Sequence, residues 1–220
     1  LQDREALAAY GTAFKAVSQL LREGRSFSGH ERNCAFPNCR GAPFANVSAA
    51  TGLDFADDGR AIALTDWDHD GDLDLWVRNR TGPRLRLMQN QTIDADSIGP
   101  DKSSFVTLRL RGTDSNRDAI GARVSVGLSP ATPSDDGASR SEKLPLADLV
   151  QTLRAGDAFL SQSSKWLHFG LGGATTIDHV SVRWPSGKTQ RFTEIKPGGR
   201  YLLVEGDDSP TRAAEQKREI

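Results

Sequence analysis

Residues 66–75 read Asp-Trp-Asp-His-Asp-Gly-Asp-Leu-Asp-Leu, with five aspartates at alternate positions and one glycine after the third of them. Carboxylates this close together repel one another, and a hard divalent cation with oxygen ligands relieves that repulsion. Ca²⁺ accepts about 6–8 oxygen ligands in a flexible geometry, so it suits a short acidic loop. The spacing predicts a calcium loop. The alternative is an acidic hairpin turn in contact with solvent.

The predicted ligands are the aspartates of this loop, in two roles. The carboxylates expected to converge on the ion are those of Asp66, Asp68, Asp70 and Asp74. Asp72 is expected to offer its backbone carbonyl, Gly71 to permit the sharp turn, and His69 to point to solvent. An EF-hand requires glutamate at the twelfth position of the loop, where this chain has Val77. The flanking residues also look like strands, so we expect a calcium loop between two strands.

Short strands separated by Gly- and Pro-rich turns are expected along most of the chain. The predicted strands are 61–65, 73–77, 84–88, 106–111, 122–128, 166–169, 180–184 and 201–204. Apolar and polar residues alternate in most of them, as in half-buried strands. The pattern predicts a mainly β protein. We expect an antiparallel β-sandwich or barrel-like domain, with the calcium-loop β segment appended and one N-terminal helix.

The expected helix covers residues 3–23 and is amphipathic. One apolar stripe is formed by Leu7, Tyr10, Phe14, Val17 and Leu21, which recur at spacings of three and four residues. Such a stripe can dock on the β-domain of the same chain or on a helix of a partner protein. The sequence leaves both interpretations open.

The only cysteines are Cys34 and Cys39, which are separated by four residues. In an oxidising compartment a pair this close can form a small-loop disulfide, and this is our expectation. The alternatives are two free thiols, or a metal site that includes His30. A zinc site would need a fourth ligand that the neighbouring sequence does not offer.

Several segments resemble known families. Residues 52–65 and the acidic loop look like an FG-GAP/VCBS repeat. The segments similar to an ASPIC/UnbV domain are IGARV at 120–124, FLSQSS at 159–164, LHFGLG at 167–172 and VRWPSG at 182–187. Together the motifs resemble the bacterial CRTAC1-like secreted proteins. That resemblance implies an extracytoplasmic location, whether periplasmic, on the cell surface or secreted, and a role in contacts with protein partners.

Length and charge limit the remaining classes of protein. The chain has 220 residues and a net charge of −1, which does not favour nucleic acid as a partner. It has no apolar run of the about 18 residues that a transmembrane helix needs. The N-terminal residues are charged, without the apolar core of a signal peptide, and the first is Leu, so we expect a processed product or a fragment.

Four segments are expected along the chain. They are the helix and linker at 1–30, the FG-GAP-like calcium segment at 31–100, the ASPIC/UnbV-like domain at 101–206, and a charged tail at 207–220. The tail is expected to be disordered or weakly helical. Within the third segment, residues 129–142 are expected to form a solvent loop.

No catalytic motif stands out. Ser163, His168 and Asp178 can be drawn as a hydrolase triad, but no G-x-S-x-G elbow is present and His168 lies in an apolar strand. We therefore expect a non-catalytic, calcium-stabilised interaction module, an accessory subunit of a larger envelope or membrane-associated assembly. The N-terminal helix is the expected docking element. The alternative is a carbohydrate-binding module that contacts a glycan through Trp67 and Trp76 near the ion.

Overall fold

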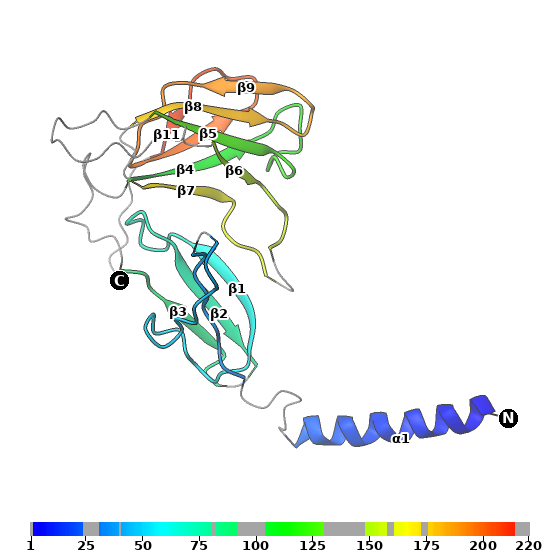
Figure 1. The fold of residues 1–220 in the computed structure, drawn as a ribbon. Coiled ribbons are helices and arrows are strands. Elements are labelled where there is room, and N and C mark those ends of the chain that lie inside the picture. Colours follow the sequence, from blue (N-terminus) through cyan, green and yellow to red (C-terminus); the bar gives the residue numbers. More distant parts are fainter. Residues whose placement is uncertain are drawn as a thin grey trace. The chain divides into compact units, whose positions relative to one another are not determined.

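A computed structural model of the protein describes residues 2–23, 31–39, 41–80, 82–91, 104–129, 148–157, 161–172 and 176–213. Over these residues the fold is mainly β, with three sheets and one N-terminal helix, as the sequence predicts (Figure 1). The chain divides into two compact units. The first comprises Leu1–Arg60 and Asn79–Arg84, and the second comprises Ala61–Arg78 and Leu85–Ile220.

The helix α1 spans Gln2–Arg22 in the first unit. Asp3 and Glu5 in its first turn and Arg22 in its last turn oppose the helix macrodipole favourably. The apolar stripe is exposed: Leu7, Tyr10 and Phe14 retain 69%, 70% and 60% of their accessible surface. In the described part of the chain, no helix combines the length and apolarity that crossing a membrane requires.

In the first unit, residues 31–39 and 41–58 form neither helix nor strand. Arg32 forms a two-pronged ion pair with Asp54, its Nε lying 2.5 Å from one carboxylate oxygen. Cys34 and Cys39 are both exposed free thiols, and each Sγ lies 3.6 Å from the backbone carbonyl oxygen two residues before it. Whether they pair in an oxidising compartment is untested, and the disulfide stays a prediction. His30, which the alternative metal site would need, lies outside the described residues.

Two strands flank the acidic loop and a third strand follows them, as predicted. They are β1 (Gly59–Thr65), β2 (Asp74–Asn79) and β3 (Leu85–Met88), hydrogen-bonded in the order β1-β2-β3. The acidic loop connects β1 to β2. The antiparallel register of β2 and β3 places Leu75 opposite Met88 and Arg78 opposite Leu85.

Eight further strands of the second unit form two four-stranded sheets that face each other (Figure 1). One sheet has the order β11-β10-β4-β7, from Thr211–Arg212, Gly199–Val204, Ser104–Arg111 and Trp166–Gly172. The other has the order β6-β5-β8-β9, from Leu149–Thr152, Arg123–Ser129, Thr176–Arg183 and Thr189–Phe192. The pairing is antiparallel except between β10 and β4, which are parallel.

The core of the sandwich comes from alternate residues of both sheets. In β4, Val106 and Leu108 are fully buried, and in β8, Val180 and Val182 are fully buried. Burying a side chain of this size contributes about 1.5–3 kcal/mol. Because strand residues alternate between faces, Arg109, which lies between the buried residues Leu108 and Leu110, projects from the outer face of its sheet.

The tail differs in part from the prediction. Thr211 and Arg212 form the short strand β11, paired with Leu202 and Tyr201 of β10, instead of being disordered or helical. Without β11, the edge of β10 would leave backbone hydrogen-bonding groups unpaired, and those groups favour the addition of a strand. Residues 130–147 lie outside the described residues, and they contain all but the first residue of the loop predicted at 129–142. Residues 214–220 and residues 158–160, which include the start of one motif, lie outside them as well.

Candidate functional site

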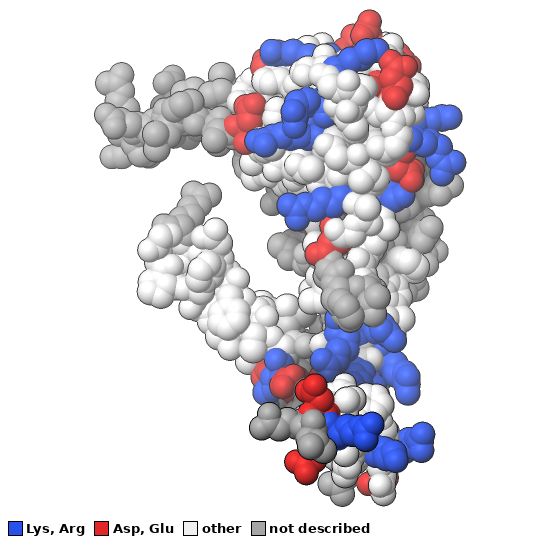
Figure 2. Space-filling view, turned by 90° about the vertical axis from the view of Figure 1, so that its right-hand side faces the viewer, with Lys and Arg blue, Asp and Glu red and all other residues white. Residues whose placement is uncertain are grey.

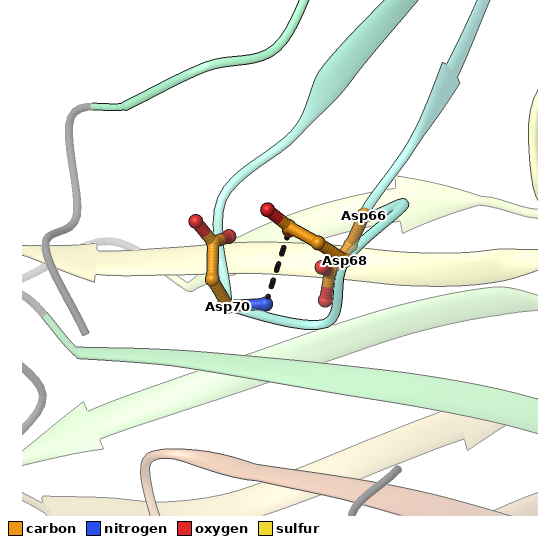
Figure 3. Close-up of side chains that lie close together, drawn as sticks. All are labelled: Asp66, Asp68 and Asp70. Carbon is orange, nitrogen blue, oxygen red and sulfur yellow. Dashed lines mark hydrogen bonds between the residues drawn. The ribbon is translucent and has the colours of Figure 1, made fainter. Parts of the chain in front are cut away.

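Three of the five aspartates come together in the loop between β1 and β2. One carboxylate oxygen from each of Asp66, Asp68 and Asp70 lies within 4.8 Å of the others (Figure 3). Oxygens that share one Ca²⁺ lie about 2.3–2.6 Å from it, and therefore at most about 5 Å from one another. The spacing of these oxygens fits one calcium ion.

Local hydrogen bonds give the loop its curvature. Asp68 Oδ1 accepts the N–H of Asp70 at 3.4 Å, and Asp70 Oδ1 accepts the N–H of Asp72 at 3.0 Å. Such aspartate-to-backbone bonds across two residues are a standard turn device. His69 and Gly71 between them have positive φ angles of 65° and 99°. The sequence of turns brings the carboxylates to one side.

Asp74 anchors the loop at its base. Its side chain is fully buried, and its two carboxylate oxygens accept the backbone N–H groups of Trp67 and Asn90, both at 2.8 Å. An ionised carboxylate has about four lone-pair sites, so these bonds are compatible with a metal contact as well. The ligand role of the Asp74 carboxylate and that of the Asp72 carbonyl stay predictions.

Asp66 is the aspartate whose surroundings most require a cation. It is 8% exposed, and neither carboxylate oxygen has a hydrogen-bond partner of normal geometry. Burial raises the pKa of Asp66, although the nearby Arg200 guanidinium and the Gly71 N–H act against the rise. Burying a carboxylate without a partner is costly, and a divalent ion would supply the missing interaction.

Asp70 is strained electrostatically as well. Burial raises its pKa to about 6, and the carboxylates of Asp72, Asp68 and Asp66 add to the rise, against the effect of the Asp72 N–H. A folded-state pKa above the unfolded value of about 3.9 means that stability falls as pH rises through the interval between them. Above about pH 6 the ionised Asp70 therefore lowers the stability of the folded loop when no cation is bound, and a bound cation would remove this loss.

The sequence predicts that the His69 side chain points to solvent, but the structure places it differently. It is half-buried and lines a cavity of about 380 Å³. The left-handed backbone at this residue, with a φ of 65°, turns its side chain away from the direction that a strand-like loop would give it. A protonated His69 ring would lower the pKa of Asp66.

The wall of this cavity opposite the loop is the outer face of the β11-β10-β4-β7 sheet. Thr107 and Arg109 of β4, Trp166 and His168 of β7, and Arg200 of β10 all line it. Of these, only His168 stands out in the sequence as a candidate site residue. The alternation of apolar and polar residues within 106–111 does mark an outer face of that strand, but the pattern cannot show which other strands lie beside the strand.

The residues of the sketched hydrolase triad have other contacts. His168 Nδ1 lies 3.2 Å from Thr107 Oγ1, and burial lowers the pKa of His168. The Asp178 carboxylate lies 2.7 Å from His179 Nδ1. Among the described residues, no hydrogen bond links Ser163, His168 and Asp178 to one another.

Trp67 of the acidic loop and Trp76 of β2 pack on each other. The ring centroids of Trp67 and Trp76 are 5.2 Å apart in an edge-to-face arrangement, and both side chains are half-buried. Trp67 also lines the cavity.

Charges on the molecular surface are mixed: the face drawn in Figure 2 carries Lys and Arg as well as Asp and Glu side chains.

The two facing sheets and their shared core define a β-sandwich domain. Residues 112–210, from the loop after β4 to the residue before β11, match the family described as ASPIC and UnbV. This match identifies the ASPIC/UnbV domain that the motifs predicted. It covers somewhat less than half of the chain, and the acidic loop lies outside it. No curated protein matches the sequence.

Proposed function

We propose that this chain is a calcium-stabilised, non-catalytic interaction module that acts outside the cytoplasm, as an accessory subunit of a larger envelope or membrane-associated assembly. The observation that carries the calcium part is the Asp66 carboxylate, which is 8% exposed and accepts no hydrogen bond of normal geometry. Asp68 and Asp70 place further carboxylate oxygens within 4.8 Å of it. The proposal includes an FG-GAP/VCBS-type identity for the loop segment and a CRTAC1-like organisation of the chain.

An ion in this loop would have a structural task. Asp66, Asp68 and Asp70 would hold it with their carboxylates, and the Asp72 carbonyl would add a neutral oxygen. The charge of the ion would offset the repulsion that contributes to the raised pKa of Asp70, about 6. Extracellular modules bind calcium with Kd values of about 10⁻⁴–10⁻³ M, which agrees with a loop of this size and with the proposed location.

Chelation is expected to lower the melting temperature. A ligand that binds only the folded state stabilises it by about 2.7 kcal/mol at a hundredfold excess over Kd. For a chain of this size that corresponds to about 5–10 °C. Thermal melts of wild type, Asp70→Ala and Asp72→Ala, each with calcium and with chelator, measure the effect. Wild type and Asp72→Ala should respond to chelator, because the Asp72 carbonyl survives, whereas Asp70→Ala should respond little.

Two controls complete this test. Mg²⁺ should restore little of the lost stability, because it demands a tighter octahedral geometry than the loop offers. Metal analysis of the purified protein shows whether chelation removed the ion. A wild-type protein with no bound calcium and identical melting temperatures in both conditions would leave only the acidic hairpin turn.

The non-catalytic part of the proposal is supported by the surroundings of the polar side chains. The Ser163 hydroxyl accepts the backbone N–H of Leu64 at 3.1 Å, which is a structural contact. His168 is engaged by Thr107 Oγ1 at 3.2 Å and by the ring of Phe105, which is stacked on it with the centroids 5.5 Å apart. These contacts explain the histidine and serine without a reaction.

The helix α1 is the proposed docking element for a protein partner. A Phe14→Asp, Val17→Asp double variant should leave the β-domain folded and weaken recovery of the partner, because charges would replace the exposed apolar stripe. Affinity isolation from the native envelope, quantified for wild type and variant, provides the measurement. A Thr12→Asp, Gln19→Asp variant places the same charge on the opposite face and should recover the partner normally. Equal recovery by all three proteins would refute helix docking, and loss of the β-fold would show internal packing.

A further inference from the structure

The cavity beside the acidic loop has the size of a ligand site. Its volume is about 380 Å³, and its lining residues all belong to the second compact unit. Small-molecule sites in proteins have volumes of about 300–1,000 Å³, whereas one water occupies about 30 Å³ in the liquid. The space therefore suits a molecule of one or two rings better than a single small ion.

The wall of this cavity is predominantly basic. Arg109, Lys165 and Arg200 line it, and Asp66 is the one acidic residue among the described residues of its lining. Lys165 is partly neutralised by Asp118, whose carboxylate lies 2.5 Å from its Nζ. Arg109 and Arg200 are always charged, and they interact electrostatically with Asp118 and Asp66, respectively. Among the described lining residues the cationic side chains still outnumber the carboxylates, so the field in the cavity favours an anion.

A tryptophan holds the two guanidinium groups in position. Arg200 Cζ lies 4.5 Å from the ring centroid of Trp166, and Arg109 Cζ lies 5.8 Å from it. Both distances are within the about 6 Å over which a cation is attracted to an aromatic ring. Planar guanidinium groups fixed in this way are suited to bidentate recognition of a carboxylate.

Hydroxyl groups add hydrogen-bond donors. Ser163 Oγ accepts the N–H of Leu64 at 3.1 Å, and Ser164 Oγ accepts the N–H of Trp166 at 3.2 Å. Each serine uses an acceptor position in this bond and keeps its O–H to donate. Both residues line the cavity, so their O–H groups are available to oxygen atoms of a ligand.

We propose that this cavity binds an acidic saccharide, with the sugar carboxylate at Arg109 and Arg200 and the sugar ring beside Trp67. The volume exceeds what a lone carboxylate fills, and the wall combines aromatic surface with hydroxyl and amide groups, which is the mixture that a ring bearing many hydroxyls requires. The proposal depends on these side chains and does not require an ion in the acidic loop.

Calorimetric titration of the full chain with glucuronate, galacturonate, glucose and acetate tests this assignment. A uronate should bind at least tenfold more tightly than glucose, because it adds a charge-assisted pair, and more tightly than acetate, because it adds the ring. The affinity should fall as salt rises. Binding of glucose as tight as that of both uronates, equal binding of acetate, or no binding of either uronate would overturn the proposal.

Charge-removing variants locate the site. Arg109→Gln should weaken uronate binding about tenfold, the loss of one charge-assisted contact. Arg111→Gln, on the same strand, removes the same charge outside this cavity wall and should change affinity less than about twofold. Lys165→Gln provides a second variant should Arg109→Gln fail a thermal-melt control for folding. Unchanged affinity in the folded cavity variants would contradict the assignment.

Discussion

A Gly71→Ala variant should lose about 2–5 kcal/mol of stability, since a left-handed backbone costs a non-glycine residue about 1–2 kcal/mol and overpacking costs about 1–3 kcal/mol. Gly71 has a φ of 99°, and a Cβ at this position would lie 2.0 Å from Cε1 of Phe105. Unbonded carbons are normally about 3.5–4.0 Å apart. The Phe105 side chain is 7% exposed and stacks on His168, so it cannot move aside without breaking other contacts.

Denaturant unfolding of the variant, with calcium present, measures this loss. Gly198→Ala is a matched control, because Gly198 also has a positive φ of 71°, but a Cβ added to it would meet no atom within 4 Å. The control should show only the backbone cost. A Gly71→Ala, Phe105→Leu double variant should recover part of the stability that the contact between the new Cβ and the Phe105 ring removes. Equal losses at Gly71 and Gly198 would show that contact with the Phe105 ring is unimportant.

The parts of the fold that the sequence predicted are those encoded by nearby residues. Alternating aspartates around Gly71 mark the loop, and alternating apolar residues mark the strands on either side and most of the sandwich strands. Each of these signals needs only a few consecutive residues, because side-chain direction in a strand repeats every two positions. The apolar stripe of α1 is likewise encoded by residues three and four positions apart.

Features that depend on distant residues were not predicted. Arg200 lies beside Thr107 because β10 runs parallel to β4, and nothing in either strand specifies that neighbour. The cavity with its arginines and Trp166 follows from that pairing. The strand β11 likewise forms because β10 presents an edge. Asp74 shows a subtler limit: its spacing groups it with the predicted ligands but does not reveal that its carboxylate also accepts the backbone N–H groups of Trp67 and Asn90.

The structural role of Glu205, the residue directly after β10, is also not revealed by local sequence patterns. Glu205 is 3% exposed, and its carboxylate joins three parts of the sandwich. One oxygen, Oε2, accepts the N–H groups of Thr113, Asp114 and Ser115 at 3.0, 3.1 and 2.8 Å. The other, Oε1, accepts the hydroxyls of Ser115 and Ser186 at 3.0 and 2.5 Å. Burial acts to raise the pKa of Glu205, but these hydrogen bonds hold it at about 2.

Glu205→Gln should therefore destabilise the sandwich by about 3 kcal/mol at neutral pH, because an NH₂ group would face donors and a charged acceptor would be lost. The folded pKa of about 2 lies below the unfolded value of about 4.3, so the contribution of Glu205 is complete above about pH 4.3 and is lost as pH falls toward 2. Wild-type stability should decline over that interval, and the decline should be shallower in the variant.

Denaturant unfolding at a series of pH values from about 6 down to about 2.5 measures both effects. Glu194→Gln serves as the control, because Glu194 is exposed and the substitution removes the same charge. The control should reproduce the wild-type pH profile, whereas Glu205→Gln should approach wild type only at the acidic end, where the native carboxylate is becoming protonated. If the free energy of unfolding of Glu205→Gln differed from that of wild type by the same amount at every pH, the negative charge of Glu205 would not be what stabilises this part of the sandwich.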